Sequence, residues 1–238
     1  MSHDIFDSDY VAKIVIPEKE QDIKEKVDSL TNIVAELKDT IKKIEEKKKK
    51  VNLEKEDAAV NSFIGTSFLQ NEEKKLISEW IHPKKIIKFS LLYNNAIDSD
   101  STNTFHYNCD GIFPTVTVIL DTSGRRFGGF STQNWSQSPV GGGYSRAPSS
   151  FIFNLSQKKK YDLKNQADAN AIYRHNSYGP TFGAGNDLYL SNSCKSNTNS
   201  YCNPSSYITG NVNLLGNKGQ TNFQVSSYEV YHVIIEKD

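Results

Sequence analysis

The sequence predicts an α+β fold, with an antiparallel β-sandwich core and flanking helices preceded by a long coiled-coil helix. Up to about residue 60 the chain has no glycine, is dominated by lysine and glutamate, and carries a heptad repeat. Beyond that point glycine, serine, asparagine and aromatic residues form short alternating runs. A chain of 238 residues has room for one such domain and an appendage. We therefore expect an N-terminal extension at 1–17, a coiled coil at 18–57 and the domain at 62–238.

The coiled coil is predicted from apolar residues spaced alternately by four and three. The seam residues are Ile23, Val27, Leu30, Val34, Leu37, Ile41 and Ile44. Val27, Val34 and Ile41 occupy position a, where β-branched residues favour a parallel two-stranded coiled coil and hence a homodimer. The alternative is a stripe that packs on the chain's own domain, but a strict repeat of about 3.5 residues favours a seam between helices. Pro17 suits the first turn of this helix.

A run of four lysines at 47–50 interrupts the seam near its end. Such a run is typical of a phosphate-binding or import patch. Acidic neighbours, among them Glu45 and Glu46, dilute its charge. We therefore interpret the run as a solvated helix end, in which Lys48 at position a weakens the coiled coil.

A shorter helix is expected at 67–81, directly before the β-rich part. Its apolar residues fall on one face, and Pro83 ends it. These residues are Leu69, Leu76, Ile77, Trp80 and Ile81. We expect this helix to cover the sheet rather than to take part in chemistry.

Six strands are predicted from short alternating runs between turn residues. They are Thr115–Asp121, Arg126–Ser131, Ser150–Ser156, Asn170–Arg174, Asp187–Ser191 and Gln224–Ile235. Ser123-Gly124 forms the turn of the first hairpin. The segments Leu91–Ala96 and Thr104–His106 are interpreted as short helices. Residues 193–222, rich in serine, asparagine and glycine, predict no regular element and are typical of a mobile loop that carries partner contacts.

Composition argues against several classes of protein. The formal net charge is zero, so the chain has no overall electrostatic attraction to nucleic acid or to an acidic membrane. No apolar run approaches the ~18 residues that span a bilayer, and the first residues lack the basic start and apolar core of a secretory signal. Three cysteines, an odd and sparse number, suit a reducing compartment. We therefore expect a cytoplasmic protein that neither enters membranes nor binds nucleic acid.

The candidate nucleophile is Cys109, three residues after His106. A thiolate beside an imidazole could be reactive, but a buried structural cysteine is the favoured interpretation. Cys194 and Cys202, in the polar segment 193–222, would then react first with thiol reagents. The histidines and cysteines do not occur at zinc-ligand spacing, and no phosphate or dinucleotide motif is present, so we expect no metal and no cofactor.

Three acidic residues, Asp110, Asp187 and Glu229, form a second candidate for chemistry. Asp110 precedes a glycine and Asp187 follows Gly185-Asn186, so both suit turns, where a carboxylate accepts backbone amides. Glu229 lies in an expected central strand and needs a partner, because an unpaired buried charge is costly. We therefore favour a structural network over a catalytic set. The candidate partners of Glu229 are Arg125, Arg126 and Arg174.

Two glycine-rich motifs dominate the β-rich part, Phe127-Gly128-Gly129-Phe130-Ser131 with nearby Trp135, and the stretch 179–190. Further motifs are Leu91-Leu92-Tyr93, Phe105-His106-Tyr107-Asn108-Cys109-Asp110-Gly111, Pro114-Thr115-Val116-Thr117-Val118-Ile119, Ser150-Phe151-Ile152-Phe153-Asn154-Leu155 and Tyr228-Glu229-Val230-Tyr231. In order and spacing these motifs resemble the TLDc domain family. The resemblance covers roughly the last two-thirds of the chain.

The resemblance implies a non-catalytic regulatory or protective protein. Members of this family are associated with resistance to oxidative stress, and several bind the vacuolar proton pump and alter its assembly or activity. Here a coiled coil stands where some members carry long pump-contacting extensions. A second hypothesis is therefore a structural scaffold component that docks through its coiled coil into a larger assembly, such as a cytoskeletal one. An enzyme that uses Cys109 or the three acidic residues is the third.

Partner contacts are expected on loops rather than on the sandwich core. The two candidate segments are 136–149 and 193–222. Large side chains of mixed polarity are typical interface anchors. The candidate contact residues are Tyr144, Arg146, Tyr201 and Tyr207.

Overall fold

The computed structural model describes residues 8–61, 63–65, 67–85, 87–137 and 141–235, with the backbone alone for 8–18 and 55–61. The chain divides into two units, Met1–Lys55 and Glu56–Asp238. Residues 1–7 of the predicted N-terminal extension and residues 138–140 of the predicted contact segment lie outside the described part.

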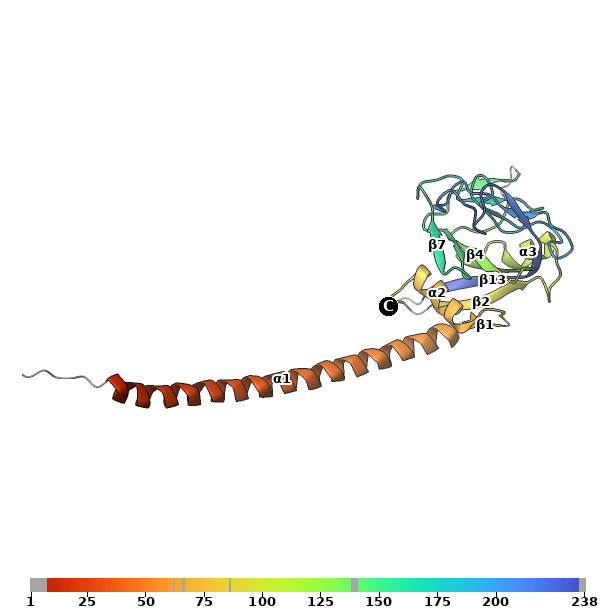
Figure 1. Cartoon of the computed structure of the whole chain (residues 1–238). Helices are drawn as coiled ribbons and strands as arrows, with labels where there is room; N and C mark the ends of the chain where they lie inside the picture. Colours follow the sequence, from red (N-terminus) through yellow and green to blue (C-terminus); the bar gives the residue numbers. More distant parts are fainter. Residues whose placement is uncertain (1–7, 62, 66, 86, 138–140, 236–238) are drawn as a thin grey trace, which may run out of the picture. The chain divides into compact units, whose positions relative to one another are not determined.

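Helix α1 (Ser8–Asn61) is a single helix of 54 residues (Figure 1), about 80 Å long at a rise of 1.5 Å per residue. The predicted coiled-coil segment 18–57 lies inside it. The helix begins before Pro17, so the prediction that Pro17 sits in its first turn was wrong. A proline removes one backbone hydrogen bond of a helix, and the bonds on either side carry the helix through this position.

The seven seam residues of α1 are all exposed, with between 48% and 61% of their surface accessible. Full burial of an apolar side chain of this size stabilises a protein by about 1.5–3 kcal/mol relative to leaving it in water. An apolar stripe without cover therefore runs along the described part of this helix.

Helix α2 (Asn71–Ile81) ends where the sequence predicts but begins later than residue 67. A reciprocal capping box sets its start, in which the side chain of Gln70 and that of Glu73 bond the backbone at each other's position. Ile77 is fully buried, and the ring centroids of Trp80 and Phe153 are 5.9 Å apart. The helix packs with residues of one sheet face in a single apolar cluster, which confirms that it covers the sheet.

The first sheet has seven strands in the order β1-β2-β13-β3-β4-β6-β7. Their bounds are β1 (Phe63–Ile64), β2 (Ile87–Asn94), β13 (Val225–Ile235), β3 (Thr115–Asp121), β4 (Arg126–Ser131), β6 (Phe151–Asn154) and β7 (Lys159–Asp162). All neighbours are antiparallel except β1 and β2. The predicted hairpin between β3 and β4 is confirmed, with Gly124 at φ +79° in its turn.

The predicted helix at Leu91–Ala96 is wrong, because most of this segment belongs to strand β2. Its partner is β13, which places Tyr93 opposite Val230 and Leu91 opposite Tyr231. Pairing with β13 on both sides of a bulge at Leu92 places the backbone of β2 in the sheet, and this tertiary pairing overrides local preference. The other short helix is confirmed and longer than predicted, as α3 (Thr102–Cys109), which is capped by the side chain of Ser101.

The second sheet has six strands in the order β12-β11-β10-β9-β8-β5, all antiparallel. Their bounds are β12 (Thr221–Phe223), β11 (Ser200–Cys202), β10 (Leu188–Tyr189), β9 (Thr181–Phe182), β8 (Ile172–Arg174) and β5 (Gly143–Ser145). The segment 193–222, predicted to have no regular element, contains β11 and reaches β12. It also buries Cys194, Tyr207 and Leu214 in the core, so its polar composition conceals packed structure.

The two sheets pack face to face around an apolar core that includes Phe105, Phe127, Trp135 and Phe182. A side chain at Gly129 of β4 would collide with the ring of Phe182 in β9, because a Cβ there would lie 2.6–2.8 Å from ring carbons. The indole of Trp135 is buried beside this contact and donates its N–H to Thr115 Oγ1 at 3.0 Å. The absence of a side chain at Gly129 thus permits the close packing of the sheets.

Replacing Gly129 with valine should destabilise the domain strongly, since a branched side chain must displace Phe182. Overpacking of a core costs about 1–3 kcal/mol or more, and each kcal/mol lowers the melting temperature of a domain of this size by about 2–4 °C. We expect insoluble protein or a melting temperature lower by about 10 °C in a thermal unfolding scan.

Gly143→Ala is the matched control, because no atom lies within 4 Å of a Cβ built at Gly143. Its melting temperature should stay close to that of the unchanged protein. A soluble Gly129→Val protein with an unchanged melting temperature would contradict the proposed close contact between the sheets.

Candidate functional site

The outer face of the six-stranded sheet carries a row of tyrosines. In β8, Ile172 is buried in the core, so the next residue, Tyr173, points to the opposite face and is half-buried. β10 repeats the pattern with buried Leu188 and half-buried Tyr189. In β11, Tyr201 is half-buried between two buried neighbours. Because side chains alternate between the two faces of a strand, these phenol rings point away from the core.

The strand register brings these rings together. Tyr144 of β5 lies opposite Tyr173, and Tyr189 lies opposite Tyr201. Tyr178, which follows β8, contacts both Tyr173 and Tyr189 and so spans the short strand between them. Successive ring centroids are 4.9, 5.4, 4.9 and 5.2 Å apart, and all the rings are inclined to one another. We call this row the tyrosine strip: Tyr144, Tyr173, Tyr178, Tyr189 and Tyr201.

Hydrogen bonds fix both ends of the tyrosine strip. The hydroxyl of Tyr144 donates to the carbonyl of Ala184 at 2.6 Å, and Asn186 Nδ2 donates to the hydroxyl of Tyr201 at 2.5 Å. Burial raises the pKa of Tyr144 and of Tyr189, and neighbouring phenols raise both further. These hydroxyls are therefore uncharged at neutral pH. Tyr144 is the most open ring, with 45% of its surface exposed.

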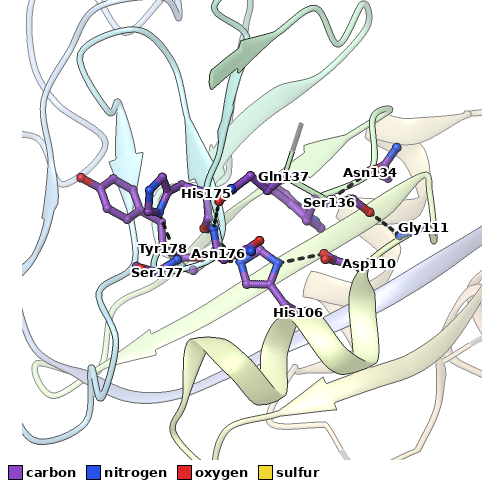
Figure 2. Close-up of polar contacts among 12 residues, drawn as sticks. His106, Asp110, Gly111, Asn134, Ser136, Gln137, His175, Asn176, Ser177 and Tyr178 are labelled. Atoms are coloured by element: carbon purple, nitrogen blue, oxygen red, sulfur yellow. Dashed lines mark hydrogen bonds and ion pairs between the residues drawn. The ribbon is translucent and has the colours of Figure 1, made fainter. Parts of the chain in front are cut away.

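The turn at 175–178 places Tyr178, and His106 of α3 holds this turn (Figure 2). His106 Nε2 lies 3.1 Å from the carbonyl oxygen of His175 and 3.0 Å from that of Tyr178. Its Nδ1 lies 2.8 Å from Asp110 Oδ1. Nδ1 thus faces a carboxylate oxygen and Nε2 faces two backbone carbonyl oxygens. His106 is thus a positioning residue for the tyrosine strip.

Two further hydrogen bonds join the segment 134–137 to the same region (Figure 2). Gln137 Oε1 accepts the backbone N–H of Asn176 at 2.9 Å. Ser136 Oγ accepts the backbone N–H of Gly111 at 3.0 Å, just beyond α3. The turn that carries Tyr178 is therefore anchored to two other parts of the chain, α3 and the segment 134–137, which are themselves joined through Gly111.

The four predicted contact residues have different positions in this structure. Tyr144 and Tyr201 both belong to the tyrosine strip, and Arg146 is exposed directly after β5. Tyr207 is fully buried, and its hydroxyl donates to the carbonyl of Ala171 at 2.8 Å. Tyr207 is therefore a core residue, which corrects its prediction as a surface anchor.

Tyr173, Tyr178 and Tyr189 are members of the strip that the sequence analysis missed. A signal for two of them was present, because Tyr173 and Tyr189 follow buried apolar residues inside predicted strands. Period-two alternation therefore points both rings outward. Which strands lie beside each other depends on the sheet order, and the alternation does not contain that information.

The family model of the TLDc domain matches residues 63–234. This match includes both sheets and the whole tyrosine strip, and it covers well over half of the chain. The chain belongs to the TLDc domain family. No curated protein matches its sequence.

The acidic residues of this TLDc domain form structural contacts. Asp187 accepts three backbone amides, from residues 205 to 207, at 2.8–3.2 Å. Glu229 accepts from Asn94 Nδ2 at 3.1 Å and from the hydroxyl of Tyr231 at 2.7 Å. Burial raises the pKa of both carboxyl groups. The three backbone amides oppose the rise at Asp187, and the hydroxyl of Tyr231 opposes it at Glu229.

The predicted arginine partners of Glu229 were wrong. Arg125 pairs with Asp121 at 2.6 Å, and Arg126 pairs with Glu73 at 2.5 Å across to α2. Neutral amide and phenol groups take their place beside Glu229. These donors lie on the adjacent strand β2, on β13 itself and in the segment before α2, where Ser67 and Phe68 also bond the carboxylate.

All three cysteines are buried in the TLDc domain. This confirms the prediction for Cys109 and corrects the one for Cys194 and Cys202, which lie in the packed part of segment 193–222. Burial raises the pKa of each thiol above its ordinary value. A thiol in this state is a poor nucleophile, since the thiolate is the reactive form.

Within the described ranges, no group of three or more His, Cys, Asp or Glu side chains lies close enough together to hold a metal ion. No helix in the described part is long and apolar enough to cross a membrane.

A mild alkylating reagent at neutral pH should modify none of the three cysteines at an appreciable rate in the folded protein. Access then requires local opening, and an opening that costs about 3 kcal/mol slows labelling about 100-fold. Mass spectrometry of folded and denatured samples measures the ratio for each site. Rapid modification of Cys109 in the folded protein would support the reactive-pair hypothesis instead.

Proposed function

We propose that this TLDc protein is a non-catalytic cytoplasmic interaction module and that its tyrosine strip contacts a protein partner. The observation that carries the proposal is the continuous row of five partly exposed phenol rings on the outer face of one sheet. Tyrosine is enriched at protein interfaces because it offers a large apolar surface together with a hydroxyl for hydrogen bonds. The buried thiols and the satisfied carboxylates support a role other than catalysis.

The tyrosine strip suits recognition because its rings are already held in place. Four of them lie at strand positions, and Tyr178 is fixed through His106. Contacts between inclined rings run along the whole row. Little side-chain freedom is then lost on binding, which favours affinity. Arg146, exposed beside β5, adds a charged group that can select an acidic or carbonyl-rich partner surface.

Membership in the TLDc family supports a partner connected with oxidative-stress protection, or a subunit of the vacuolar proton pump. The pump is the partner that we propose to test. A second candidate function is that of a scaffold component, and the uncovered apolar stripe of α1 favours it. The two functions use different parts of the chain and can be separated by variants.

The double variant Tyr144→Ala/Arg146→Ala should weaken binding to purified vacuolar proton pump. Loss of an interface anchor costs about 2 kcal/mol, which corresponds to a roughly 30-fold increase in the dissociation constant. Surface plasmon resonance or co-sedimentation measures the affinity, and a thermal scan shows whether the domain stays folded.

Tyr107→Ala is the matched control, because Tyr107 is 89% exposed on α3 and is not part of the strip. This variant should bind like the unchanged protein. If the double variant also binds like the unchanged protein, the tyrosine strip is not the contact face. If the unchanged protein does not bind the pump at all, the proposed partner is wrong.

A further inference from the structure

The exposed stripe of α1 is accompanied by an uneven distribution of charge along the helix. Between Lys19 and Glu36 there are five acidic and three basic residues, a net charge of −2. Between Leu37 and Glu54 there are seven basic and four acidic residues, a net charge of +3. The helix is therefore negative in its first half and positive in its second half.

We propose that α1 pairs with a second copy of itself in an antiparallel coiled coil. This inference goes beyond the tyrosine strip and rests on the helix alone. A second copy is the occupant that the charges select, because an identical helix in the reverse direction presents its negative half to the positive half. Opposite charges on the two helices set partner choice and orientation in coiled coils.

The apolar layers fit this direction without a gap. With Val34 placed against Leu37 of the second copy, Ile41 meets Leu30 and Val27 meets Ile44. Each of these layers combines position a of one helix with position d of the other. At the ends, Lys48 lies against Ile23 of the second copy. All seven seam residues are then covered, and the layers reach from residue 23 to residue 48 of both helices.

Lysine at position a explains why the parallel arrangement, which the β-branched residues alone favour, is rejected. In a parallel pair every residue faces its own copy, so Lys48 would face Lys48 inside the seam. Residues 47–50 of one helix would also lie beside residues 47–50 of the second copy, so eight lysines would gather at one level of the coiled coil. Like charges at such short distance are destabilising.

The flanking positions agree with the antiparallel direction. Glu45 comes to lie beside Lys24 of the second copy, an attractive pair that occurs twice by symmetry. Lys47 comes to lie beside Lys26 of the second copy, but Lys26 already forms an ion pair with Asp22 of its own helix at 2.7 Å. The repulsion at that position is therefore reduced.

Disulfide exchange between two single-cysteine variants tests the direction. Leu30→Cys and Ile41→Cys are prepared as full-length proteins, mixed at micromolar concentration and equilibrated in a glutathione redox buffer. In the antiparallel pair these two positions face each other, so the expected product is a disulfide between residue 30 of one chain and residue 41 of the other. Peptide mass spectrometry identifies the joined positions. The unchanged protein is the control, since its three native cysteines are buried.

The alternative direction gives a different product. In a parallel pair residue 30 faces residue 30, and residues 30 and 41 are about 16 Å apart at 1.5 Å per residue. Leu30→Cys would then form a disulfide with itself and not with Ile41→Cys. That product overturns the proposal, and so does a mixture that forms no disulfide.

Exchange of charges provides a second measurement that leaves the seam intact. Lys24→Glu alone should weaken the dimer, because residue 24 then faces Glu45 of the second copy with like charge. The double variant Lys24→Glu/Glu45→Lys should restore it. Analytical ultracentrifugation should show a dissociation constant raised about three- to tenfold and then recovered, as expected for two exposed ion pairs. A double variant no tighter than Lys24→Glu contradicts the antiparallel direction, and a monomeric unchanged protein contradicts the dimer.

Discussion

The close approach of the two sheets at Gly129 is the constraint on which the rest of the domain depends. Because β4 has no side chain there, the ring of Phe182 fits directly against its backbone, and Trp135 and Phe105 pack around it. Phe182 lies in β9, near the middle of the second sheet. This contact sets the distance between the sheets at β9, and β8 and β10 lie on either side of that strand.

This constraint connects the core to the outer surface. β8 and β10 pair with β9 in a register fixed by Ile172 and Leu188, both of which lie opposite Phe182. The next residue of each strand is a tyrosine that faces outward. The tyrosine strip is therefore a consequence of how the inner residues pack, and His106 adds the turn that completes it. Side chains that are held in this way lose little freedom on binding. The tyrosine strip is therefore better suited to recognition than a mobile loop would be.

Local patterns predicted the parts of the structure that depend on nearby residues. The long helix, the hairpin at Gly124 and helix α2 follow from heptad spacing, turn chemistry and the spacing of apolar residues. The errors arose where distant segments decide. Leu91–Ala96 forms a strand because β13 lies beside it, Glu229 bonds Asn94 because β2 is its neighbour, and segment 193–222 is packed although its composition is that of a loop. The same limit applies to the site, since Tyr144 and Tyr201 could be chosen from sequence but their union through Tyr173, Tyr178 and Tyr189 depends on sheet order.

Hydrogen–deuterium exchange on the full-length protein, alone and bound to purified vacuolar proton pump, tests the central claim most directly. We expect slower exchange on binding at 143–145, 172–178, 188–189 and 200–202, the backbone that carries the tyrosine strip. Exchange in α2, which covers the opposite sheet, should not change. Slower exchange confined to α2 or to α1, with the strands of the tyrosine strip unaffected, would show that the contact face lies elsewhere.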